Sequence, residues 1–368
     1  QDLAQATVLQ SFNRTNFAFN DQGFSATVHL SMRLMRQIRV AILGFGAVWS
    51  FSSPGVHASQ VLERLPEDHC AFMQVHHTIK ARARERFQAC SEVVAVKGSK
   101  KPMPALGYGT AGLYGEALTE GLKFWLTSGG RLIDTAEAYH NQQDIAAAIR
   151  ESGVPREEIW ITSKVLPRDK NSSSDVVASV DQSLKDLGVD YIDLMLIHGP
   201  NGAAPPAELW SGLLAAKQAG KILNAGVSNY NQDLLEGIAK ATSEAPSVNQ
   251  IEFHPWATEW TKEYVEWMQG QGIAVMAYDV LGGATGSAQN DIVAALAEKY
   301  KVTNAQLLIR WALDKGVVAL VGAHSEEHIL EDLNCSAPHM SARDTLYLES
   351  QERPEHWTEY TGDESVPH

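Results

Sequence analysis

The sequence of 368 residues contains few cysteines. Only three occur, Cys70, Cys90 and Cys335, and none belongs to a Cys-x-x-Cys pair or stands at metal-ligand spacing from a histidine. We therefore expect neither a structural zinc site, nor any other bound metal, nor a disulfide framework.

Positive charge is also scarce, because 30 lysines and arginines face 44 aspartates and glutamates, which gives a formal net charge of -14. Nucleic acids and anionic membranes are bound through basic surfaces. The acidity thus argues against both partners and favours a small-molecule substrate. A hydrophobic content of 44% is typical of a globular protein with a large core.

Long hydrophobic runs are absent from most of the chain, and the clearest one, residues 40–51, is too short for a comfortable membrane span. It follows three arginines and precedes a small-residue site that ends at Ala58. That order is typical of a secretory signal peptide. We expect segment 32–58 to be such a signal, with a single buried helix as the alternative. The residues concerned are Arg33, Arg36 and Arg39.

The segment 76–87, HHTIKARARERF, is locally basic. It is interpreted either as the continuation of an organellar address or as one solvated helix face. We expect residues 1–94 to be a poorly ordered extension without catalytic groups. The location is then the secretory route or an organelle if the signal is functional, and the cytoplasm if it is not.

After residue 99 the sequence alternates short β-branched runs with longer amphipathic ones, as βα units do. One such helical run carries its apolar residues on one face, and Gly188 follows as a stop. These residues are Val176, Val177, Val180, Leu184 and Leu187. Eight runs have the character of buried strands. They are Ala105–Gly109, Leu132–Thr135, Ile159–Ser163, Tyr191–Ile197, Asn224–Val227, Val248–Phe253, Ala274–Tyr278 and Val317–Val321.

Apolar strands that alternate with helices predict a parallel sheet covered by helices. Eight units in about 250 residues match a closed (β/α)8 TIM barrel of class α/β. We therefore predict one barrel domain over residues 95–348 and a C-terminal tail over 349–368. No Gly-x-Gly-x-x-Gly follows the first strand, and the GFGAV that begins at Gly44 lies inside the signal-like segment.

Ionisable residues follow three neighbouring predicted strands, at the barrel end where active sites lie. Asp134 and Tyr139 follow the second strand, Lys164 ends the third and His198 ends the fourth. A phenol is a weak acid at neutral pH, and a nearby ammonium group stabilises its anion. A carboxylate would hold that buried ammonium in place, and an imidazole could donate a hydrogen bond to a carbonyl oxygen.

Each of these residues also has an ordinary interpretation when it is taken alone. An aspartate after a strand is often a helix cap, a tyrosine there packs at the rim, and a lysine or histidine is commonly exposed. A barrel hydrolase that uses Asp134 with Glu137 is a further alternative, but no second carboxylate pair or metal cluster accompanies them.

Seven stretches of the sequence occur together in one order: KPMPALGYGT, GGRLIDTAEAY, IWITSKV, DYIDLMLIHGP, GKILNAGVSNYN, SVNQIEFHPW and GIAVMAYDVLG. Through these stretches, residues 97–348 resemble the aldo-keto reductase family. The resemblance implies a catalytic tetrad of Asp134, Tyr139, Lys164 and His198, with hydride transfer from NADP(H) to a small carbonyl substrate and a proton from Tyr139. It also implies a monomer.

The same resemblance implies further cofactor contacts. Ser228, Asn229 and Gln250 would bind the nicotinamide carboxamide, and Tyr278 would stack on the ring. Capping by Ser228 and Asn229 and core packing by Tyr278 are the alternatives. Other implied cofactor residues are Gly109, Thr110 and Glu331, and the expected walls of the substrate pocket are Trp256 and Tyr114.

The sequence departs from the family where a lysine and an arginine usually hold the 2′-phosphate of NADPH. Gly322 and His328 stand at those positions. We expect relaxed cofactor choice, with NAD(H) possible and NADPH favoured at acid pH if His324 or His328 is protonated. Asp279 adds negative charge near the expected pyrophosphate. A cofactor-binding regulatory or sensory barrel with little turnover is therefore the alternative function.

Overall fold

The computed structural model describes residues 89–242, 244–282, 291–323 and 325–350. The predicted signal segment 32–58, the basic segment 76–87 and His324 lie outside the described residues. The same holds for most of the predicted C-terminal tail.

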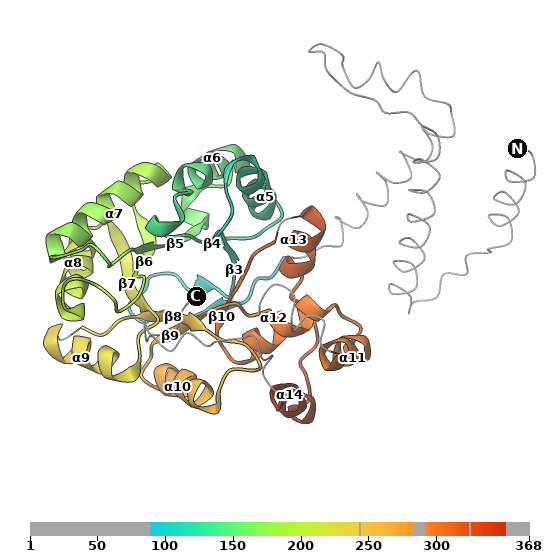
Figure 1. Cartoon of the computed structure of the whole chain (residues 1–368). Helices are drawn as coiled ribbons and strands as arrows, with labels where there is room; N and C mark the ends of the chain where they lie inside the picture. Colours follow the sequence, from blue (N-terminus) through green and yellow to red (C-terminus); the bar gives the residue numbers. More distant parts are fainter. Residues whose placement is uncertain (1–88, 243, 283–290, 324, 351–368) are drawn as a thin grey trace, which may run out of the picture. The chain divides into compact units, whose positions relative to one another are not determined.

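Eight parallel strands form a closed barrel in the order β10-β3-β4-β5-β6-β7-β8-β9 (Figure 1). The predicted strands are all confirmed, with bounds that shift by two residues at most. The strands are β3 (Leu106–Gly109), β4 (Leu132–Asp134), β5 (Trp160–Val165), β6 (Ile192–Ile197), β7 (Ile222–Ser228), β8 (Val248–Glu252), β9 (Ala274–Tyr278) and β10 (Val318–Val321).

Helices surround the barrel, as Figure 1 shows. Local signals set their ends: the Ser172 side chain accepts a hydrogen bond from the Asp175 amide at the start of α7, and Gly188 ends that helix with φ 63°. None of the helices in the described ranges has the length and hydropathy that crossing a membrane requires. They are α5 (Gly115–Thr127), α6 (Gln142–Ser152), α7 (Ser173–Leu187), α8 (Pro206–Gln218), α9 (Gln232–Thr242), α10 (Glu259–Gly270), α11 (Asp291–Tyr300), α12 (Asn304–Asp314), α13 (Glu326–Leu333) and α14 (Ala342–Glu349).

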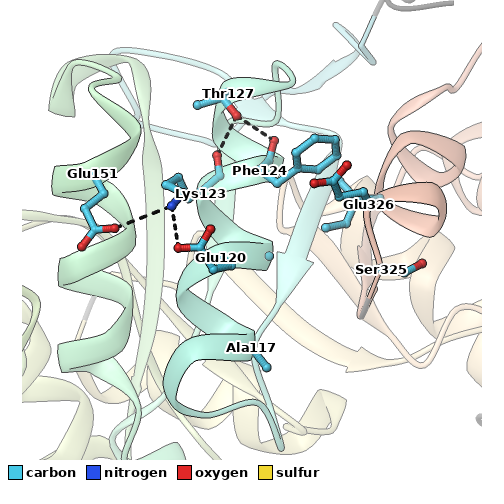
Figure 2. A pocket seen from close by; sticks show the side chains of 10 residues that line it. Ala117, Glu120, Lys123, Phe124, Thr127, Glu151, Ser325 and Glu326 are labelled. Carbon is cyan, nitrogen blue, oxygen red and sulfur yellow. Dashed lines mark hydrogen bonds and ion pairs between the residues drawn. The ribbon is translucent and has the colours of Figure 1, made fainter. Parts of the chain in front are cut away.

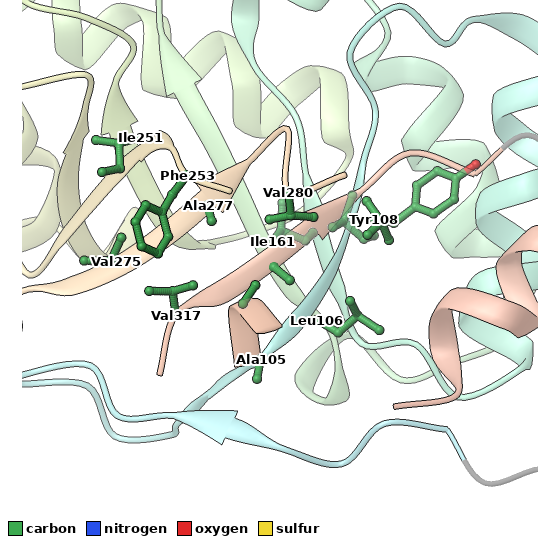
Figure 3. Close-up of a cluster of buried hydrophobic side chains, with 14 of the residues drawn as sticks. Ala105, Leu106, Tyr108, Ile161, Ile251, Phe253, Val275, Ala277, Val280 and Val317 are labelled. Carbon is green, nitrogen blue, oxygen red and sulfur yellow. The ribbon is translucent and has the colours of Figure 1, made fainter. Parts of the chain in front are cut away.

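Alternate strand residues build two cores. The larger core lies between strands and helices, and Figure 3 shows Ile161, Phe253 and Tyr108 among its side chains. A smaller core includes Leu132 and Leu194 and also takes in Met103. Met103 belongs to a two-stranded antiparallel hairpin of β1 (Val93–Val94) and β2 (Met103–Pro104), which the sequence analysis did not predict.

Residues 89–94, assigned from the sequence to the extension, pack on the barrel. The Cys90 amide donates to the Leu333 carbonyl at 2.8 Å, and Glu92 forms an ion pair with Arg310. Cys90 is also bonded to Cys335, with their Cα atoms 5.1 Å apart. The expectation of no disulfide is therefore wrong for this pair. The two cysteines are 245 residues apart, and no local pattern could have joined them.

Candidate active site

The carboxyl ends of β4 and β5 place Asp134 beside Lys164. Lys164 is fully buried, and its Nζ donates to Asp134 Oδ1 at 2.5 Å and to the Thr135 carbonyl at 3.1 Å. Burial by itself would lower the pKa of this ammonium group. The charge of Asp134 and the contact with Tyr139 act in the opposite direction, and the pKa of Lys164 is raised. Lys164 therefore carries its positive charge at neutral pH.

Tyr139 ends the short 3-10 helix η1 (Glu137–Tyr139), which follows β4. Its hydroxyl group lies 3.2 Å from Lys164 Nζ. The turn is fixed by Asn141, whose side chain donates to the carbonyls of Thr110 and Leu113 at 2.8 and 3.0 Å. The phenol and the ammonium group are thus in direct contact.

His198 follows β6, and its ring meets that of Tyr139 edge-on, with centroids 5.6 Å apart. Burial, and then the nearby charge of Lys164, lower the pKa of His198 to about 3. The imidazole is therefore neutral at physiological pH. Its Nδ1 atom is buried without a hydrogen-bond partner among the described residues. One ring nitrogen of a neutral imidazole carries a proton that can be donated to a substrate oxygen.

Glu137 is the second carboxylate of the hydrolase alternative. In the structure, both of its carboxylate oxygens have structural partners. One of its oxygens accepts from the Leu166 amide at 2.9 Å, and the other pairs with Lys170 at 3.1 Å. Glu137 therefore holds the segment that follows β5, and no contact with Asp134 is seen in the described part of the chain.

The expected nicotinamide residues form a connected group. The Asn229 amide donates to Ser228 Oγ at 3.2 Å, and the Tyr278 hydroxyl donates to Asn229 Oδ1 at 3.0 Å. Asn229 and Asp279 have left-handed backbones, with φ of 60° and 55°. Such conformations cluster at functional sites because the surrounding structure must enforce them.

Gln250 joins this group to the charged residues. Its Nε2 atom donates to Asp134 Oδ2 at 2.7 Å, and its backbone carbonyl accepts from Ser228 Oγ at 3.0 Å. The sequence analysis did not predict the contact with Asp134, because 116 residues separate the pair. The only available signal is the position of Asp134 at the end of a strand in a closed barrel. A carboxylate in that position can be expected to meet a polar side chain from another strand, but the sequence does not say which one.

The other expected site residues differ in position. Thr110 is buried and donates from Oγ1 to the Asp134 carbonyl at 2.9 Å, next to Gly109 at the end of β3. Trp256 is buried, whereas Tyr114 is 57% exposed at the start of α5. Glu331 lies on α13, and no contact joins it to Lys164 or Tyr139 in the described structure. The pocket role of Trp256 and Tyr114 stays a prediction.

The start of α13 presents acidic groups to solvent. Gly322 and His328 are exposed, and Glu326 and Glu327 form the first turn of the helix. Ser325 caps this turn by accepting from the His328 amide. The described part of the loop between β10 and α13 therefore supplies a hydroxyl group and free amides, but no lysine or arginine.

The sequence model of the aldo/keto reductase family matches residues 105–351. The chain therefore belongs to this family. It is an oxidoreductase of the aldo/keto reductase type, a class that works with a nicotinamide cofactor.

Two curated relatives match most of their own length. The NAD/NADP-dependent indole-3-acetaldehyde reductase of Schizosaccharomyces pombe is 35% identical, over 66% of this chain and 88% of that protein. The glyoxal reductase of Bacillus subtilis is also 35% identical, over 69% of this chain and 90% of that protein.

Solved structures agree in fold. An aldo-keto reductase of Bombyx mori in complex with NADP is 28% identical with a TM-score of 0.64, and the match covers 70% of this chain and 93% of that one. An aldo/keto reductase of Brucella melitensis has the same identity and TM-score, with 70% and 98% covered.

Proposed function

We propose that this protein reduces small aldehydes and ketones to alcohols, with Tyr139 as the proton donor. One observation carries the proposal: Lys164 contacts both the Asp134 carboxylate and the Tyr139 hydroxyl group, beside a neutral His198. A substrate oxygen placed between Tyr139 and His198 would accept hydrogen bonds from both.

Each residue has a distinct task in this proposal. Tyr139 gives its proton to the developing alkoxide, and the adjacent ammonium of Lys164 stabilises the phenolate that remains. Asp134, held by Gln250, balances the buried charge of Lys164. His198 orients the carbonyl group without a change in its own charge.

The nicotinamide cofactor supplies the hydride when it is bound. Ser228 and Asn229 offer the hydroxyl and amide groups that suit a carboxamide, and the Tyr278 ring lies beside them as a flat surface. Gln250 connects these residues to Asp134, and Asp134 contacts Lys164. The hydrogen-bonding groups near Lys164 therefore suit a nicotinamide carboxamide.

We propose that NADH is used as well as NADPH. Gly322 and His328 carry no permanent positive charge, and Glu326 and Glu327 would repel a 2′-phosphate group. Fluorescence titration of the full chain with both cofactors tests this choice. Comparable affinities at neutral pH are expected; a hundredfold preference for NADPH at neutral pH contradicts it.

The reductase proposal is tested by following NAD(P)H absorbance with glyoxal and with a larger aromatic aldehyde. Steady turnover of either aldehyde by the full chain is expected. Tight cofactor binding without turnover of any carbonyl compound would instead support the regulatory or sensory barrel.

We also propose a secretory or organellar route, because segment 32–58 has the order of a signal peptide. The bond between Cys90 and Cys335 supports an oxidising compartment. Sequencing the amino terminus of the mature protein tests this; a terminus upstream of residue 32 contradicts removal of the segment.

A further inference from the structure

A groove lies between α5 and α13. Its volume is about 400 Å³, and Ala117 and Thr127 mark its extent along α5 (Figure 2). Phe124 and Ile329 give it an apolar floor. None of its lining residues belongs to the group around Lys164. Ser325 and Glu326 also belong to the start of α13, where the 2′-phosphate of the cofactor is discussed above.

The groove carries surplus negative charge. Glu120, Glu151 and Glu326 line it, with Lys123 as the one cation. Lys123 is shared between Glu120 at 2.5 Å and Glu151 at 3.7 Å. Glu326, on the α13 side in Figure 2, forms no ion pair within the described part of the chain. The groove therefore suits a ligand with several positive charges and some apolar surface.

The chain itself enters the described structure at one end of this groove. An ideal Cβ atom on Gly129, two residues after α5, would lie 2.7 Å from Cβ of Ala89. The next residue, Cys90, is hydrogen-bonded to Leu333 at the end of α13. Residue 89 is thus held between the carboxyl ends of the two helices that form the groove.

The residues just before that point have the matching chemistry. The sequence 82–87 reads RARERF, with Arg82, Arg84 and Arg86 followed by Phe87. Seven residues of chain reach about 23 Å when extended, and the 13 residues of α5 are about 20 Å long. The length of segment 82–87, its positive charge and the aromatic side chain of Phe87 therefore all suit the groove.

We propose that the groove between α5 and α13 is the docking surface for segment 82–87 of this same chain. The arginines meet Glu120 and Glu326, and Phe87 lies against the apolar floor.

Limited trypsin digestion of the full chain tests the proposal, with cleavage after Arg82, Arg84 and Arg86 followed by mass spectrometry. The Glu120→Gln/Glu326→Gln variant removes two carboxylates without adding a trypsin site. Cleavage at these arginines should become about tenfold faster, since two exposed ion pairs are lost. The matched control Glu157→Gln/Glu263→Gln removes two exposed carboxylates elsewhere and should cleave at the wild-type rate.

Hydrogen exchange gives a second measurement that does not depend on the protease. In an Arg82→Gln/Arg84→Gln/Arg86→Gln variant, the amides of α5 and α13 should exchange faster than in the wild type, with unchanged exchange in α7 and α8. Equal cleavage and exchange in wild type and variants overturn the proposal. Protection that grows with protein concentration also overturns it, because the occupant is then a second copy.

Discussion

Two buried carboxylates at opposite ends of the barrel show how the same group serves different purposes. At the base, Asp193 of β6 pairs with Lys101 at 2.6 Å and Arg156 at 2.7 Å, and both cations reach solvent. At the mouth, Asp134 pairs with Lys164, which is fully buried and also contacts a phenol. The first arrangement holds strands together, and the second keeps a positive charge beside a group with a proton to give.

Replacing Tyr139 tests whether the residues at the mouth serve catalysis and not stability. Tyr139→Phe should lower kcat about a thousandfold, because a positioned general acid contributes roughly that much. The free energy of unfolding and the cofactor affinity should stay near the wild-type values, since the ring is kept. Stopped-flow kinetics with calorimetry on the same sample separates the two effects. A large loss of stability with unchanged kcat would show that the mouth is structural.

Replacing Asp193 tests whether the ion pairs at the base serve stability and not catalysis. Asp193→Asn leaves two partly exposed cations without their charged partner and should cost about 1–3 kcal/mol of unfolding free energy. The kcat of the folded fraction should not change. Urea denaturation combined with activity measured at low denaturant checks both statements, and a variant of normal stability would contradict the role of Asp193.

The disulfide between Cys90 and Cys335 is a further contact that we expect to serve stability alone. It closes a loop across 245 residues of sequence separation, and the Cys90→Ser/Cys335→Ser variant should lose about 2–4 kcal/mol. Cys70→Ser is the matched control, which changes the third cysteine and leaves this bond intact. Equal melting temperatures of the double variant and the wild type would rule out a stabilising role.

Asp332 is a third buried carboxylate, and no cation pairs with it in the described ranges. Burial, followed by repulsion from Glu331, raises the pKa of Asp332 to about 7 from 3.8. The folded state therefore holds its proton more tightly, so stability falls as pH rises from 3.8 through about 7. Asp332→Asn should raise the free energy of unfolding by on the order of 2 kcal/mol more at pH 8 than at pH 5. Melting curves at both pH values measure this, and an equal effect at each contradicts the assignment.

The sequence predicted the barrel because each βα unit carries its own local pattern. The residues Asp134, Tyr139, Lys164 and His198 could be predicted because a closed barrel gathers its strand ends on one rim. The hydrogen bond from Gln250 to Asp134 has no local signal. The disulfide likewise depends on a contact that only the folded chain creates.

The central claim is that the Lys164 ammonium makes Tyr139 an effective acid. The Asp134→Asn/Lys164→Met variant removes both buried charges together, so neither is left unpaired, and it retains Tyr139. Single-turnover hydride transfer at saturating cofactor is the direct measurement. The account predicts a loss of at least about a hundredfold with cofactor still bound; a rate within a few-fold of the wild type would contradict it.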